Sequence, residues 1–289
     1  MSEIDLVAAA RQTAAATITA FSRTGLWIGL FALSAALAAL ASTFGTLANF
    51  AGYALLVLAG SAWAVAIFRE LIPIGVSGRF AADTWRVFIA TWLFHLVSAL
   101  IIFIVVLFLI ILSVILIVIS GYEPPAGEVA DVSGSIAALQ ASGAIWLLYI
   151  VMLASSAALI WFGLRLVLFA AATATRGTVL VFQTWGLTKG KVVPIACLAA
   201  VFVAAPVGVA LFLGDATAAT LGLPSTWNDV HAARTGFVQA DFLPQLSFNR
   251  FLQTLYLVPA ILSGHCLSAT LYKLLRGRVQ GQTDAPVPH

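Results

Sequence analysis

The feature that most restricts the fold is an apolar stretch over residues 87–120, which holds no Asp, Glu, Lys, Arg, Gly or Pro. As a helix rising 1.5 Å per residue it is about 50 Å long, whereas a membrane span crosses about 30 Å of hydrocarbon. A turn inside the stretch is not expected, because the first Gly or Pro after it is Gly121. We expect one long membrane helix that projects beyond the bilayer on at least one side.

The composition of the chain supports this class. Of its 289 residues 62% are hydrophobic and only 9% are charged, whereas soluble domains carry about 25% charged residues. Apolar stretches long enough to cross a membrane cover residues 26–47, 50–72, 87–120, 144–165, 192–213 and 251–275. The sequence therefore predicts an all-α, polytopic transmembrane bundle of six spans, forming one membrane domain over residues 25–278.

The expected segments outside the spans are short. Residues 1–24 have an amphipathic pattern and predict an interfacial helix, capped by Ser2, with Ile4, Val7, Ile18 and Phe21 near one face. A tight connection at 48–49 makes the first two spans an antiparallel hairpin.

Three further segments are expected to be irregular. Residues 121–138 combine Pro, Gly and acidic side chains, and residues 214–249 form the largest external loop, with a short helix after Ser225 or Thr226. Residues 279–289 read as a disordered tail.

The basic residues indicate the orientation. Of the fourteen Lys and Arg residues, only Arg234 and Arg250 fall on one side of the six-span arrangement. The other twelve share the opposite side with both termini. Positive charge accumulates on the cytoplasmic side of membrane proteins. We therefore predict a multi-pass protein of a bacterial inner (plasma) membrane, with both termini in the cytoplasm.

Two histidines are candidates for an intramembrane polar site. His95 follows Arg86 by nine residues and His265 precedes Lys273 by eight, which places both about 12–14 Å from the same membrane surface. They could form a proton relay or a metal pair if the third and sixth spans are neighbours. Alternatively, each imidazole hydrogen-bonds a neighbouring helix. No carboxylate or thiolate completes a ligand set, so no metal is predicted.

Arg165 and Glu70 are the other candidates for a polar site. Arg165 lies near the cytoplasmic end of the fourth span and Glu70 near that of the second. A buried ion pair between them, or extension of Arg165 to lipid phosphates, would satisfy both residues. A ligand-binding role for Arg165 is the alternative.

Motifs for catalysis are missing from the sequence. It has no GxSxG, HExxH or P-loop pattern and no paired carboxylates, so we predict no catalytic residues, no cofactor and no enzyme. The absence of a Lys or Arg run argues against nucleic acid as a partner. Cys197 and Cys266 lie in apolar segments and are expected to be small buried side chains.

The segment over residues 165–191 is the most distinctive. After Gly177 an apolar run ending at Phe182 is followed by a mixture of apolar and polar residues, and Gly190 suits the position after a helix end. We predict a short helix in the cytoplasmic interface between the fourth and fifth spans, with Arg176, Lys189 and Lys191 at the lipid headgroups.

This segment also carries a resemblance. Arg165, followed by the run Phe182–Gly190 with Trp185 and the letters LTKG, resembles the membrane domain-like family of glycerophosphoryl diester phosphodiesterases and related six-span bacterial proteins of unknown function. This chain differs in having Leu168, Phe169 and Ala170 where that family often has Pro. The resemblance implies an architecture without the catalytic barrel, and it supplies no substrate.

Three functions follow from these observations as hypotheses. The first is a non-catalytic structural or accessory membrane protein that contacts lipids and a protein partner or a second copy of itself. The second is a small transporter or permease component with a polar path around His95 and His265. The third is a lipid-modifying enzyme, which requires Glu70, Arg165 or Asp83 to converge at headgroup depth.

Overall fold

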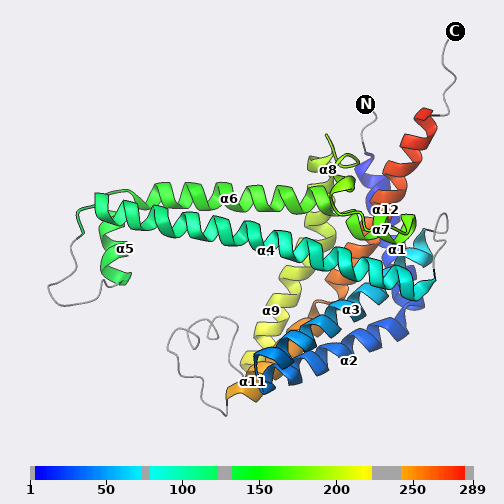
Figure 1. Cartoon of the computed structure of the whole chain (residues 1–289), viewed down its shortest axis with the longest axis horizontal. Helices are drawn as coiled ribbons and strands as arrows, with labels where there is room; N and C mark the ends of the chain where they lie inside the picture. The colour runs from blue at the N-terminus through cyan, green and yellow to red at the C-terminus, as the bar shows by residue number, and fades with distance from the viewer. Residues whose placement is uncertain (1–3, 73–78, 123–131, 223–241, 284–289) are drawn as a thin grey trace, which may run out of the picture. The chain divides into compact units, whose positions relative to one another are not determined.

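The computed structural model describes residues 4–72, 79–122, 132–222 and 242–283 (Figure 1). Within these ranges the chain is helical without any strand, and six helices are long and apolar enough to cross a membrane. The predicted all-α class with six membrane helices is confirmed at that level. The chain divides into two compact units: unit 1 comprises Met1–Thr91 and Arg165–His289, and unit 2 comprises Trp92–Leu164.

Helix α1 (Leu6–Arg23) opens unit 1. The Asp5 carboxylate caps it by accepting the backbone N–H groups of Val7 and Ala8 at 3.0 Å. This cap satisfies two of the donors that a helix start leaves free. The predicted cap, Ser2, lies outside the described residues.

Small residues of α1 pack inward, while Ile4, which precedes the helix and belongs to the predicted apolar set, is also buried. The buried residues of the helix are Ala9, Thr13 and Ala20, and the helix lies against α12 (Val258–Thr283). Val7, Ile18 and Phe21 are exposed. Small side chains face the neighbouring helix because they let two backbones approach closely.

Helices α2 (Gly25–Ala41) and α3 (Thr46–Leu71) run side by side in Figure 1. The turn between them is the 3₁₀ helix η1 (Ser42–Phe44) with Gly45 at a φ of 105°, so it precedes the predicted connection at 48–49. A Cβ on Gly52 of α3 would lie 2.8 Å from the Cα of Ala38, which shows how closely the two backbones pack.

Helix α4 (Phe80–Ile119) confirms the single long helix, although it begins before residue 87. In unit 2 its end packs against α5 (Val132–Ala141) and the start of α6 (Ile145–Leu166), through Leu116, Leu139 and Ile145. The prediction of an irregular 121–138 segment is therefore wrong from Val132 onward. A helix forms there because it buries Leu139.

Five helical segments follow α6 in the described range that ends at residue 222. They are α7 (Phe169–Arg176), the 3₁₀ helix η2 (Phe182–Trp185), α8 (Val192–Ala199), and α9 (Ala205–Thr220), which the π-helical turn η3 (Ala200–Ala204) joins to α8. The described chain then ends with α11 (Phe242–Tyr256) and α12.

The helices of the last two spans extend beyond the predicted span ends. Helix α9 continues to Thr220 and α11 starts at Phe242, so the expected loop 214–249 is helical at both edges. The short helix expected after Ser225 or Thr226 lies outside the described residues. Helix α12 continues to Thr283, past the expected tail boundary at 279, and residues 284–289 are outside the description.

Helix α12 is the centre of unit 1. It contacts α1, α3, α7, α8, η3, α9 and α11, and more than half of the apolar stretch over Phe248–Arg276, to which α12 contributes most, is buried. Leu262 and Cys266 join a buried cluster with Phe31, Trp63 and Ile67 from α2 and α3. The expectation of a buried cysteine is confirmed for Cys266, whereas Cys197 is exposed.

Two serines of α12 satisfy backbone carbonyls at breaks in neighbouring helices. Pro206 has no N–H, so the carbonyl of Phe202, four residues earlier, lacks its helical donor. The Ser263 hydroxyl donates to that carbonyl. The Ser268 hydroxyl likewise donates to the carbonyl of Val167, at the break between α6 and α7, at 2.9 Å. In a membrane, side chains of neighbouring helices supply the hydrogen bonds that such irregular backbone groups lack.

We predict that Ser268→Ala and Ser263→Ala each lower the free energy of unfolding by about 1–2 kcal/mol, because each leaves a carbonyl without a donor. The measurement is reversible unfolding in mixed micelles with increasing denaturing detergent. Ser156→Ala is the matched control, since the exposed Ser156 hydroxyl bonds only the Met152 carbonyl of its own helix. Equal effects of all three substitutions would contradict the prediction.

Candidate functional site

The most buried charge in the described part of unit 1 is Asp83, in the first turn of α4. Its side chain is 1% exposed. The Arg69 guanidinium donates to one carboxylate oxygen at 2.7 Å and that of Arg86 to the other at 3.0 Å. A carboxylate is favoured at a helix start, where backbone N–H groups point outward. Both oxygens are thus bound to guanidinium groups in a charge-assisted arrangement.

The two arginines of this cluster are only partly covered. Their side chains are 30% and 36% exposed, so each reaches the surface beside the buried carboxylate. The Arg69 guanidinium also lies 5.3 Å from the ring centre of Phe80, and Phe80 stacks on Trp27. The cluster carries one net positive charge and holds the end of α3 against the start of α4.

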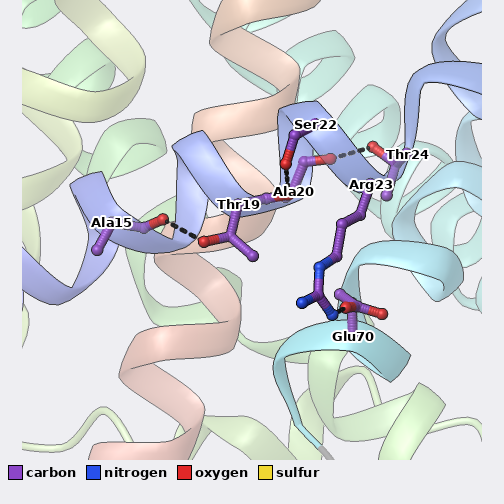
Figure 2. A network of polar contacts seen from close by, with 7 residues as sticks. All are labelled: Ala15, Thr19, Ala20, Ser22, Arg23, Thr24 and Glu70. Carbon is purple, nitrogen blue, oxygen red and sulfur yellow. Dashed lines mark hydrogen bonds and ion pairs between the residues drawn. The ribbon is translucent and has the colours of Figure 1, made fainter.

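Glu70 pairs with Arg23 rather than with Arg165. Figure 2 shows the Arg23 guanidinium extending from the end of α1 to Glu70 in the last turn of α3. Beside it, the Thr24 hydroxyl donates to the Ala20 carbonyl at 2.7 Å and receives the Trp63 indole N–H at 3.0 Å. Arg23 is the more exposed partner, with 65% of its side chain accessible.

Arg165, predicted as the partner of Glu70 or as a lipid contact, is buried near the end of α6. Its guanidinium lies 4.8 Å from the ring centre of Trp185 and donates to the Thr188 hydroxyl at 3.4 Å. The Thr188 hydroxyl in turn donates to the Arg165 carbonyl at 3.1 Å. The predicted Arg165–Glu70 pair is wrong, because closer groups from the chain that follows α6 surround Arg165.

The two histidines belong to different units. His265 of α12 is half-buried and meets Phe68 edge to face, with ring centres 5.8 Å apart. His95 is exposed in unit 2, with its ring 5.8 Å from that of Phe94. The predicted proximity of His95 and His265 stays a prediction. Among the described residues, no group of three or more His, Cys, Asp and Glu residues could hold a metal ion.

The predicted interfacial helix is not one continuous α-helix. After α7 ends at Gly177, residues 182–185 form η2 and residues 186–190 form successive turns, ending at Gly190 with a φ of 71°. Arg176 and Lys189 are exposed and Lys191 is half-buried. One of these cations precedes, and two follow, the η2 turn whose Trp185 contacts Arg165.

The arrangement has clear chemical consequences. Both carboxylate oxygens of Asp83 accept hydrogen bonds from guanidinium groups, which leaves Asp83 poorly placed to accept a proton from a substrate. Glu70, Arg165 and Asp83 each bind different residues, and the lipid-enzyme hypothesis stays a prediction. Spacing could have indicated the Asp83–Arg86 contact, since residues three apart meet on a helix. Nothing local indicated Arg69.

No protein-family model, no curated protein and no solved structure matches the chain. The resemblance to the phosphodiesterase membrane domain-like family stays a prediction that rests on residues 165–190.

We predict that Asp83→Asn lowers the free energy of unfolding by about 2–4 kcal/mol, because it leaves two guanidinium groups beside a buried neutral amide. Glu70→Gln, which removes the exposed pair with Arg23, is expected to cost about 0–1 kcal/mol. Reversible unfolding in mixed micelles, at the same salt concentration for both variants, measures the two changes in free energy. The assignment of Asp83 as the main anchor is wrong if the two substitutions cost the same.

Proposed function

We propose that the chain is a non-catalytic integral protein of a bacterial inner membrane, with both termini in the cytoplasm. It acts as a structural or accessory component through helix packing and through contacts with lipids and with a protein partner or a second copy of itself. The six long apolar helices support the multi-pass arrangement.

The observation that carries this proposal is the internal use of polar groups in unit 1. Asp83 binds two arginines, Arg165 is held by Trp185 and Thr188, and Ser268 bonds a carbonyl of a neighbouring helix. A catalytic or transporting group has to face its substrate, whereas these groups face other parts of the protein. Their chemistry is that of holding helices together.

The lipid contact that we propose lies on the segment after α7. Exposed Arg176 and Lys189 accompany exposed Val179 and Phe182 on this segment. Cations beside exposed apolar side chains favour a membrane surface with anionic headgroups. The buried Arg165–Thr188 contact gives the segment a rigid base, which supports a fixed position at the interface.

A charge-free replacement of the Asp83 cluster tests the packing role. A buried ion cluster can often be exchanged for apolar residues of similar size without loss of stability. We predict that the triple variant Arg69→Met, Asp83→Leu and Arg86→Met folds and keeps the oligomeric state and any stoichiometric partner of the wild type. Native mass spectrometry from mild detergent measures both, with Asp83→Asn alone as the destabilised comparison.

Two results would overturn the proposal. One is a triple variant that unfolds like the wild type yet fails to support the cellular role of the chain in a deletion strain. The other is a small solute that stays bound to the wild type and is lost when His95 and His265 are replaced by Gln, which would favour the transporter hypothesis.

The orientation has its own test. In a background with Cys197 and Cys266 replaced by Ala, we predict that Thr46→Cys reacts with a membrane-impermeant maleimide in intact spheroplasts. Lys189→Cys is expected to react only after the membrane is permeabilised. Both positions are exposed in the structure, so burial does not limit labelling. The opposite labelling pattern would contradict the N-in, C-in arrangement.

A further inference from the structure

A pocket of about 280 Å³ lies between α2, α3 and α11 in unit 1. It is near the η1 turn, whereas the Asp83 cluster is at the other end of α3. Asn49 lines the pocket and Arg69 binds Asp83, and twenty residues of helix separate them by about 30 Å. The pocket therefore belongs to the membrane side opposite the Asp83 cluster.

One part of the pocket is apolar. Ala35, Ala38 and Ala39 of α2 form a floor of small side chains, and Leu56 and Leu257 stand beside it. This floor provides hydrocarbon contact without a hydrogen-bonding group to satisfy. It suits an alkyl chain, which gains nothing from polar neighbours.

The other part of the pocket is polar and positively charged. Asn49, Gln253 and Thr254 supply neutral hydrogen-bonding groups, and Arg250 supplies the charge. Arg250 is exposed, and no ion pair joins it to another residue within the described ranges. None of the described residues that line the pocket is acidic. An arginine fork in such a setting matches a phosphate group.

We propose that this pocket binds an anionic phospholipid, with part of one acyl chain on the alanine floor and the phosphate at Arg250. Ligand pockets usually measure about 300–1,000 Å³, so this volume holds a part of the lipid while the rest stays in the bilayer. The two halves of the pocket match the two halves of that ligand. The site is independent of the packing role proposed above, and either can fail without the other.

The test compares lipid retention in variants that lose the same charge at different places. Three proteins are placed in nanodiscs and then released for measurement: the wild type, Arg250→Gln and Arg11→Gln. The nanodiscs contain phosphatidylcholine with a minor share of phosphatidylglycerol, and both lipids have identical acyl chains. Arg11 is exposed on α1 and lies outside the pocket. Native mass spectrometry then gives the ratio of the two lipids retained by each protein.

We expect the wild type and Arg11→Gln to retain phosphatidylglycerol preferentially. In Arg250→Gln the ratio of phosphatidylglycerol to phosphatidylcholine is expected to fall about tenfold, because one charge-assisted contact is removed. Arg250→Lys keeps a charge at the site and is expected to retain part of the preference. Equal preference in Arg250→Gln and Arg11→Gln overturns the proposal, as does a wild type without preference. An unchanged oligomeric state in Arg250→Gln separates this outcome from failure of the packing role.

Discussion

A backbone carbonyl inside hydrocarbon needs a donor, and this requirement governs the arrangement of unit 1. Of the helices around α12, one has a π-helical turn beside Pro206 and another breaks between α6 and α7, and each irregularity removes the α-helical donor of a carbonyl. Ser263 and Ser268 of α12 donate to those two carbonyls. Because the two serines are five residues apart on one helix, they hold both irregularities to the same element. The position of α12 against its neighbours is thus set by directional bonds as well as by packing.

The charged groups follow the same requirement. Asp83 is almost fully buried, and it is tolerated because two guanidinium groups occupy its oxygens. One of these comes from α3 and the other from the next turn of α4, so the carboxylate defines how α3 ends and α4 begins. Arg165 is stabilised in a different way. Its guanidinium lies over the indole ring of Trp185 and donates to the Thr188 hydroxyl. Both solutions keep charge near a helix end, where the cost of placing it in a membrane is lowest.

Sequence reasoning identified the six membrane helices because hydrophobic length is a property of a local segment, and residues 87–120 show it most clearly. Helix ends were harder to predict. Helix α9 passes Asp215, where hydropathy suggested a loop, and α5 forms where Gly and acids suggested irregular chain. Partners could not be predicted at all when they are distant in sequence: Arg23 and Glu70 are 47 residues apart, and Ser268 and Val167 are 101 apart. Those choices depend on which helices become neighbours, and a hydropathy pattern does not encode that.

The two ends of α3 differ in how completely their polar groups are matched. At the end of α3, Arg69 and Glu70 each have a partner within the protein. Near its start, Asn49 borders a pocket in which Arg250 presents a charge that no described ion pair neutralises. Such a charge at a membrane surface is stabilised by water, by lipid phosphate or by another protein. An apolar floor directly beside it favours the lipid, because only an amphiphile places phosphate and hydrocarbon against both surfaces at once.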